Sequence, residues 1–206
     1  REHEPLGGRD PYSSSKACAE LVTAAYRESF LAAAGVAVAT ARAGNVIGGG
    51  DWSTDRLLPD FFRAVQQGLP LQVRFPDATR PWQHVLDPLD GYLRLAEALT
   101  QGAPVARGWN FGPRDEDARP VRWLLDRLSA RLPGAAWQHS GGENVHEATH
   151  LKLDSSQARS ILGWSPAWGL DRALDLTVDW HRAWIAGSDM RKVCLAQIDA
   201  HRRDAA

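Results

Sequence analysis

The sequence predicts an α/β fold, because segments typical of helices and segments typical of strands alternate along the chain. A long helix is expected over residues 12–34, where apolar residues recur at helical spacing before Gly35. The apolar segment 36–48 follows and is typical of a buried strand that runs into a glycine-rich loop. With 206 residues, of which 44% are hydrophobic, the chain is long enough to bury a substantial core.

The later elements continue this alternation. Residues 56–67 predict a helix, and Gly68 is expected to end it. Residues 71–75 alternate between apolar and polar side chains as a short strand does, whereas residues 87–99 are amphipathic with helical spacing. Further strands are expected at 108–112, 136–139 and 151–153, further helices at 120–132, 155–162, 170–185 and 190–203, and a solvated tail at 201–206.

Composition excludes several classes of partner. The 24 basic and 25 acidic side chains give a net charge of −1, so nothing indicates a nucleic-acid partner. No apolar run approaches the ~18 residues needed to span a bilayer, and no membrane partner is expected. Cys18 and Cys194 lie far apart, which gives neither a disulfide framework nor a CxxC metal pair. Isolated thiols fit a reducing compartment, so a cytoplasmic location is expected.

The start of the chain also carries information. Arg1 lies inside a polar, glycine-rich loop that extends to Asp10, and such a start is expected of a fragment of a longer protein. A dinucleotide site needs a glycine-rich turn between a first strand and a first helix. The triplet Gly48–Gly50 follows a strand but runs into a polar segment, so a flexible loop is expected there. Any dinucleotide fingerprint would then lie before Arg1.

Tyr12 and Lys16 form a Y-x-x-x-K pair at the start of the first expected helix. Residues at this spacing lie on one helix face, with Cβ atoms ~5–6 Å apart. A nearby ammonium group favours a phenolate, so the pair could act as a general acid/base on a substrate hydroxyl. The same spacing also occurs by chance at helix starts, and this alternative stays open.

Three further polar residues stand where a ligand could bind. Asn45 is expected near the carboxyl end of a parallel strand, where open α/β sheets bind ligands, or it is a simple turn residue. Arg80 offers a bidentate fork for phosphate oxygens, unless it is an ordinary surface arginine. Arg56 opens a helix after the glycine-rich loop, so its side chain and the helix N-terminus could both face an anion.

Longer motifs connect these residues to a known family. The chain carries, in this order, PYSSSK, RAGNVIGGGDW, RPWQHV, WNFGPRDEDA and GENVHEATHLKLD. On these motifs the sequence resembles the extended short-chain dehydrogenase/reductase family of sugar-nucleotide enzymes over nearly its whole length. Other members usually carry a proline-containing strand end and R-D-x-x-Y/H-V-x-D, where this chain has Ala43-Gly44-Asn45 and RPWQHV. These departures favour the CDP-glucose branch of the family.

The resemblance implies a Rossmann-type architecture. Residues 1–50 would form the C-terminal part of a doubly wound parallel sheet, without its first βα units and its glycine-rich fingerprint. Residues 51–206 would form mainly a smaller mixed α/β lobe that binds the nucleotide sugar, and residues 76–112 would partly return to the Rossmann sheet.

The resemblance also implies a role for individual residues. Tyr12 would be the catalytic base and Lys16 its partner on the nicotinamide ribose of NAD, so both would be catalytic and cofactor-binding. Asn45 and Val46 would line the nicotinamide pocket, and Asn45 would also contact the substrate. Further substrate contacts would come from Asp51 and Trp52 in a loop over the sugar, from Arg56 and Arg80 on the diphosphate, and from His146 and Glu147 on the nucleotide.

The implied reaction is an internal redox cycle in deoxysugar and lipopolysaccharide O-antigen biosynthesis. CDP-glucose would be oxidised at C4, lose water across C5 and C6, and take the hydride back at C6 to give CDP-4-keto-6-deoxyglucose. The family's elimination acid and base come from a segment that would precede Arg1, so this chain alone is expected to be inactive.

The remaining expectations concern assembly, metals and alternatives. The resemblance implies a homodimer or homotetramer for the full-length protein, since the family commonly dimerises through the helix that carries Tyr12 and its neighbour. His146 and His150 have i, i+4 spacing but no third ligand nearby, so no metal site is expected. Another family epimerase or reductase, or a noncatalytic nucleotide-sugar binding module, remains an alternative.

Overall fold

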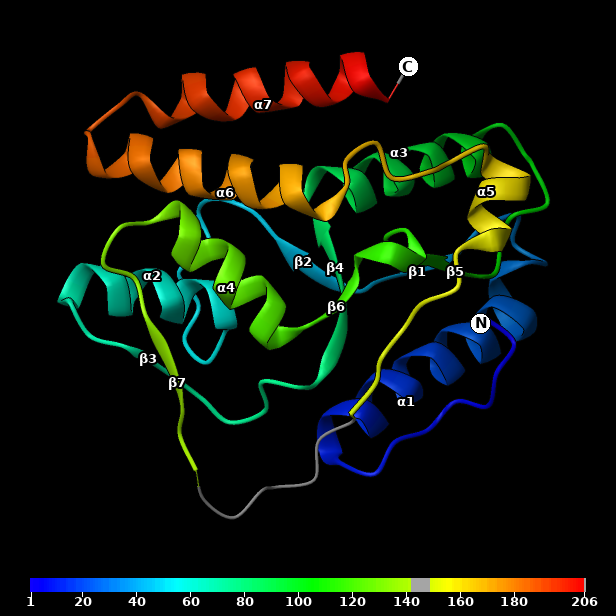
Figure 1. Ribbon diagram of the computed structural model, residues 1–206. Helices are drawn as coiled ribbons and strands as arrows, with labels where there is room; N and C mark the ends of the chain where they lie inside the picture. Colours follow the sequence, from blue (N-terminus) through cyan, green and yellow to red (C-terminus); the bar gives the residue numbers. More distant parts are fainter. Residues whose placement is uncertain (142–148, 206) are drawn as a thin grey trace. The chain divides into compact units, whose positions relative to one another are not determined.

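The computed structural model describes residues 1–141 and 149–205. The chain divides into two compact units, and each unit combines segments from distant parts of the sequence (Figure 1). Both units contain helices and parallel strand pairs, which is the arrangement expected of an α/β chain. The first unit holds residues 1–43, 88–111 and 153–165, and the second holds 44–87, 112–152 and 166–206.

The first unit begins with the long expected helix. Helix α1 (Pro11–Tyr26) starts at Asp10, whose carboxylate caps it by accepting a backbone N–H at 3.0 Å. A π-helical turn, η1 (Arg27–Leu31), continues it, and Gly35 with φ 70° follows. The helix predicted for residues 12–34 is therefore confirmed, with a change of winding that the sequence did not indicate.

Two parallel strands and two further helices complete the first unit. Strand β1 (Thr40–Ala43) pairs with β5 (Gly108–Phe111). Helix α5 (Ser156–Leu162) reaches β5 through Gln157, whose amide donates to the Gly108 carbonyl at 3.0 Å. Helix α3 (Leu86–Thr100) supplies Leu95 to the core of this unit, which also contains Val105, Trp109, Phe111, Ala158 and Trp164.

The second unit contains two small sheets. In the first sheet β4 is the central strand, parallel to β2 and antiparallel to β6, and in the second β3 lies parallel to β7. A 3₁₀ turn, η2, precedes β6. The bounds of these elements are β2 (Asn45–Ile47), α2 (Leu57–Gln67), β3 (Leu71–Val73), β4 (Thr79–His84), η2 (Asp115–Asp117), β6 (Ala118–Pro120), α4 (Val121–Arg131), β7 (Trp137–His139), α6 (Leu170–Ile185) and α7 (Met190–Asp204).

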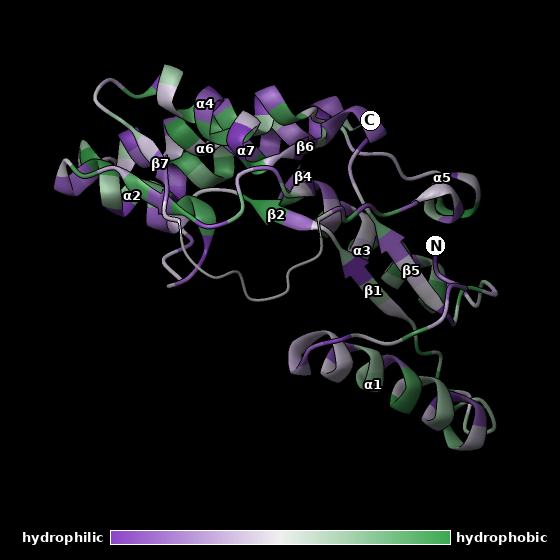
Figure 2. Ribbon diagram, turned by 60° about the horizontal axis from the view of Figure 1, so that its bottom comes forward, coloured by the Kyte–Doolittle hydropathy of each residue, from purple (hydrophilic) through white to green (hydrophobic). Residues whose placement is uncertain are grey.

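The core of the second unit lies among α2, α4, α6 and the strands. Hydrophobic residues appear along these three helices in Figure 2, where they alternate with polar ones. This alternation is the amphipathic pattern expected of helices that pack one face on a core. The buried residues of the cluster include Leu58, Phe61, Phe62, Val73, Trp82, Leu124, Leu125, Leu128, Ala173, Leu174 and Val178.

The C-terminal helix α7 is part of this folded unit. Asp189 caps it by accepting backbone N–H groups of the first turn at 3.1 and 3.3 Å. His201 is buried, and its Nε2–H donates to the Asp87 carboxylate at 2.9 Å. Asp204 accepts the Trp168 indole N–H at 2.8 Å. The prediction of a solvated tail at 201–206 is therefore wrong for His201, which is buried, and the exposed residues 202–204 belong to the helix rather than to a tail.

Two predicted strands differ from the structure. The strand expected at 36–48 is split into β1 and β2 at Gly44, where an added Cβ would lie 2.6 Å from the Pro81 carbonyl oxygen. Only Ile47 of the two short strands is buried, so the expectation of a buried strand is wrong for most of this segment. Residues 151–153 form no strand; a single parallel bridge joins Thr79 to the preceding residue His150.

Candidate active site

Tyr12 and Lys16 face each other on the first turns of α1. The Lys16 ammonium nitrogen lies 5.5 Å from the centre of the Tyr12 ring. This contact is the one expected for residues one helical turn apart. Tyr12 is 66% exposed, so its hydroxyl is open to a ligand.

Helix α1 is fixed to the strand beside it. Glu20 accepts the Thr40 hydroxyl at 2.7 Å and forms an ion pair with Arg42 at 3.5 Å. Both partners belong to β1, so this carboxylate sets the position of α1 on the strand. The Tyr12–Lys16 pair therefore lies on a helix that is bound to β1 through Glu20, one turn after Lys16 and two turns after Tyr12.

The second unit contains a pocket of about 660 Å³. Three of the residues singled out by the sequence line it, from three different elements: Asn45 on β2, Arg56 at the N-terminus of α2, and Arg80 on β4. A third arginine, Arg74, joins them directly after β3. The other lining residues are Asp55, Leu57, Asp60, Leu71, Gln72, Val73, Phe75, Trp82, Val121, Ser140 and Gly141.

The arginines of the pocket have different surroundings. Arg80 is only 8% exposed and donates from Nη1 to the Thr79 carbonyl at 2.8 Å. Arg56 is exposed and is the N-cap residue of α2, so its side chain leaves the backbone at the end of the helix where the first N–H groups lack intrahelical partners. A helix N-terminus and arginine forks both favour an anion, and phosphate in particular. The pocket can therefore hold a phosphorylated ligand.

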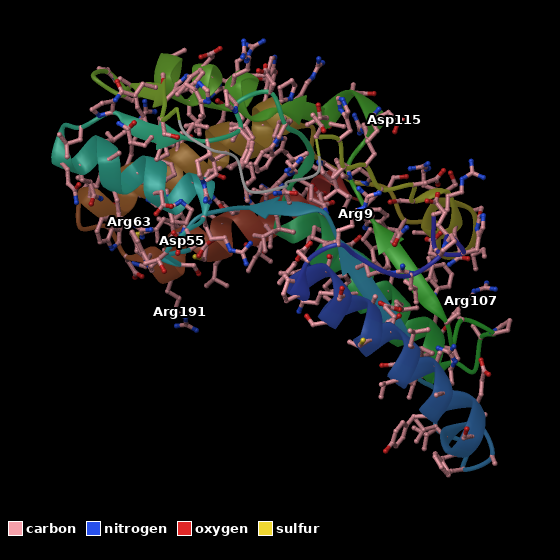
Figure 3. The ribbon with its side chains drawn as sticks, turned by 90° about the horizontal axis from the view of Figure 1, so that it is seen from below. Arg9, Asp55, Arg63, Arg107, Asp115 and Arg191 are labelled. Atoms are coloured by element: carbon pink, nitrogen blue, oxygen red, sulfur yellow. The ribbon has the colours of Figure 1, made fainter. Side chains whose placement is uncertain are left out.

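The polar start of α2 is organised by a residue that sequence analysis missed. Arg63 donates to the carbonyls of Trp52 and Ser53 at 3.1 and 3.0 Å, and it also contacts the Asp60 carboxylate. Figure 3 shows Arg63 and Asp55 beside α2. Arg63 thereby ties residues 52–53 to the helix that follows them.

The glycine triplet before Trp52 is packed rather than flexible. The backbone of Gly49 lies so close to the Trp180 indole that an added Cβ would stand 2.0 Å from its Cγ. Trp52 packs on Trp184 and Trp180, with ring centres 4.6 and 6.1 Å apart. The prediction of a flexible loop at Gly48–Gly50 is therefore wrong, because the glycines permit a close approach to α6.

Three of the other predicted site residues lie outside the pocket lining in the described chain. Val46 on β2 is exposed and pairs with Gln83 of β4. Asp51 accepts the Ser53 N–H at 3.0 Å within the same loop, and Trp52 packs on α6 as described above. His146 and Glu147 fall outside the described residues.

Two buried histidines are held in the neutral form. Burial lowers the pKa of His84 to about 4, although the nearby Asp87 carboxylate acts in the opposite direction. Its Nδ1 accepts the Leu86 N–H at 3.3 Å. Burial likewise lowers the pKa of His181 to about 4, where the ring stacks on Phe62 with centres 3.5 Å apart. Both rings are therefore uncharged at neutral pH.

The described residues provide neither a metal-binding cluster nor a membrane-spanning helix. Within residues 1–141 and 149–205, no group of three or more His, Cys, Asp or Glu side chains is arranged to hold a metal ion. Of the helices in the same part of the chain, none combines the length and the apolar character that a membrane span requires.

Comparison with known proteins identifies the family. A model described as the NAD dependent epimerase/dehydratase family matches residues 1–112. The chain belongs to this family. A CDP-glucose 4,6-dehydratase of Salmonella typhimurium is 52% identical over 198 residues, which cover 92% of this chain and 55% of that protein. A dTDP-glucose 4,6-dehydratase of Streptomyces griseus is 30% identical over 193 residues, 89% of this chain and 54% of that protein. The chain thus spans about half the length of these curated relatives.

A solved structure agrees with this assignment to the epimerase/dehydratase family. The dTDP-glucose 4,6-dehydratase of Bacillus anthracis in complex with NAD aligns with a TM-score of 0.72 at 20% identity, over 88% of this chain and 55% of that chain. This likeness shows the fold. The predicted α/β architecture, with part of a Rossmann-type parallel sheet, is therefore confirmed.

Proposed function

We propose that the protein is an NAD-dependent CDP-glucose 4,6-dehydratase, a lyase that forms CDP-4-keto-6-deoxyglucose for deoxysugar and lipopolysaccharide O-antigen biosynthesis in the cytoplasm. The observation that carries the proposal is the 52% identity to the Salmonella enzyme over 92% of this chain. The Y-x-x-x-K pair and the arginine-lined pocket support it, because the reaction needs an acid/base and a diphosphate site.

Tyr12 and Lys16 would carry the proton transfer at C4. As the substrate is oxidised, the Tyr12 oxygen takes the proton of the O4 hydroxyl, and the Lys16 ammonium, 5.5 Å from the ring, stabilises the phenolate. The carbonyl formed at C4 makes the neighbouring C5 proton acidic, so water can leave across C5 and C6. Tyr12 would be open to substrate, because its side chain is largely exposed.

The residues present fit one end of the proposed cofactor. NAD, when bound, supplies the hydride acceptor and donor of the cycle. The Tyr12 hydroxyl and the Lys16 ammonium are donors that suit the hydroxyls of a ribose. Gly48–Gly50 do not open a helix, since α2 starts only at Leu57, so they do not provide a dinucleotide phosphate turn.

The pocket of the second unit would bind the nucleotide sugar. Arg56 and Arg80 would hold the diphosphate, and the amide of Asn45 would contact the substrate. Asp51 and Trp52 would lie over the sugar. The proposed contacts also include Asn45 and Val46 on the nicotinamide. His146 and Glu147 would contact the nucleotide.

The activity can be tested directly. The full-length protein, which includes the segment expected to carry the elimination acid and base, is given CDP-glucose and NAD⁺, and the 4-keto sugar is detected by its absorbance in alkali. No signal, or a signal with UDP-glucose or dTDP-glucose only, would overturn the proposal. A product with an inverted sugar carbon would instead identify an epimerase, and binding of CDP-glucose without turnover would identify a binding module. Sedimentation of the active protein would test the proposed homodimer or homotetramer.

Tyr12→Phe tests the role of the phenol. We expect kcat to fall by about 100-fold or more, since general acid/base catalysis contributes 10²–10⁴-fold. Binding of CDP-glucose should stay within about twofold, because the pocket arginines are unchanged. Tyr26→Phe is the matched control, since Tyr26 is exposed on the same helix and contacts Phe30. Full activity in Tyr12→Phe would refute the assignment of Tyr12 as the base.

A further inference from the structure

Strand β3 and the residue directly after it present two polar side chains on the face opposite the core. Leu71 and Val73 are buried in the hydrophobic cluster of the second unit. Gln72 and Arg74 alternate with them and are exposed. Both belong to the lining of the 660 Å³ pocket. Leu71 and Val73 also line this pocket, and of these four residues only Gln72 and Arg74 have side chains that can donate hydrogen bonds to a ligand there.

The backbone that carries Arg74 is fixed by its neighbour strand. The Val73 carbonyl accepts the Ser140 N–H at 2.9 Å, and the Arg74 carbonyl accepts the His139 Nε2–H at 3.1 Å. At the other end of β3, the Leu71 N–H donates to Ala136 at 2.9 Å. Arg74 therefore extends its side chain from an anchored position, which reduces the entropy lost when it binds a ligand.

Arg74 differs from the other two arginines of the pocket. Arg80 is buried and lines the pocket from β4, where its guanidinium fork suits a phosphate. Arg56 stands at the N-terminus of α2, which also favours an anion. These two arginines can hold the two phosphates of a nucleoside diphosphate. Arg74 is neither buried nor at a helix N-terminus. Its guanidinium has no ion-pair partner in the part of the chain that the structure describes.

The hydrogen-bonding groups along the edge of the base distinguish cytosine from uracil and thymine. Cytosine has two adjacent acceptors, N3 and O2, whereas uracil and thymine have a donor, N3–H, in place of the first. A guanidinium has N–H donors only and cannot lose its proton, so its fork matches cytosine and opposes uracil. The amides of Gln72 and Asn45 can rotate to serve either base, so they cannot discriminate alone.

We propose that Arg74 selects the cytosine base, with its guanidinium donating to N3 and O2. The inference rests on the proposed function, which supplies CDP-glucose as substrate. It adds a specificity residue that acts on the base rather than on the sugar or the diphosphate.

Calorimetry with CDP and UDP tests the inference, because the two nucleotides differ only at the base edge. The unmodified protein should bind CDP about tenfold or more tighter than UDP, as expected for one bidentate base contact. In Arg74→Gln the ratio of the two Kd values should fall to within about twofold, mainly through weaker CDP binding. Arg74→Lys, which keeps the charge without the fork, should also lose most of the preference. Arg191→Gln is the matched control, because Arg191 is an exposed arginine of α7 outside the pocket lining, and it should keep the ratio.

The outcomes separate this inference from the proposed function. Equal weakening of CDP and UDP in Arg74→Gln would make Arg74 a phosphate ligand and overturn the inference. Equal binding of both nucleotides by the unmodified protein would overturn it as well, while leaving a nucleotide site in place. Failure of the unmodified protein to bind either nucleotide would overturn the proposed function itself.

Discussion

Replacing His201 by alanine is expected to destabilise the second unit strongly. Asp87 is fully buried, and its carboxylate accepts the His201 Nε2–H at 2.9 Å and the Ala167 N–H at 2.7 Å. Removing the imidazole takes one donor from a carboxylate that cannot reach water. It also removes a ring that packs on Trp168, with centres 4.8 Å apart.

The expected loss is about 3 kcal/mol. Breaking a buried charged pair by removing one partner costs roughly 3–5 kcal/mol, and a neutral hydrogen bond left unmade costs about 1–3 kcal/mol. For a protein of this size, 1 kcal/mol corresponds to a change in Tm of about 2–4 °C, so His201→Ala should lower Tm by roughly 6–12 °C. The double variant Asp87→Asn/His201→Ala should recover part of the loss, because the side chain that loses the His201 hydrogen bond is then no longer a buried carboxylate.

Urea unfolding at pH 7, followed by far-UV circular dichroism, measures this loss. His150→Ala is the control, because His150 is exposed and an exposed substitution should change the free energy of unfolding by less than about 0.5 kcal/mol. A loss below about 1 kcal/mol in His201→Ala, indistinguishable from the control, would show that the buried pair does not anchor α7.

Two further predictions concern stability. Gly49→Ala should cost about 1–3 kcal/mol in urea unfolding, since its Cβ would overlap the Trp180 ring, whereas Gly7→Ala, with nothing within 4 Å, should be neutral. Stability should fall as the pH drops from about 6.5 to about 4, because the unfolded chain protonates His84 and His181 while the folded chain, with both pKa values near 4, does not. His84→Gln should flatten this pH dependence, by up to about 1.4 kcal/mol per pH unit.

Each of these two stability predictions can be contradicted by its measurement. If Gly49→Ala is as stable as Gly7→Ala, the loop can move away from α6 at no cost. If the free energy of unfolding is constant between pH 6.5 and 5, the buried histidines do not resist protonation in the folded chain.

The helices were predictable because their determinants are local. Helical spacing of apolar residues predicted α1, amphipathic spacing predicted α3, and Gly68 predicted the end of α2. The Tyr12–Lys16 contact followed for the same reason, since helix geometry alone brings residues one turn apart together.

The features that sequence analysis missed depend on distant neighbours. The break at Gly44 reflects an approach to Pro81, and strand β6 exists because it pairs with β4, about 40 residues earlier. The segment 71–75 was recognised as a strand, but the pairing with β7 decides that Arg74 lines a pocket. His201 looked like part of a polar tail because its partner, Asp87, lies 114 residues away.

The aromatic packing of Trp52 also gives the protein a built-in optical signal. Trp52 lies 4.6 Å from Trp184 and 6.1 Å from Trp180, and the Trp180 indole donates to the Cys194 sulfur at 3.3 Å. Neighbouring indoles exchange excitation energy, and a thiol in contact with an indole quenches its emission. A shift of the Trp52 segment on α6 would therefore change the intrinsic fluorescence, so that events at this loop could be followed in real time without an attached dye.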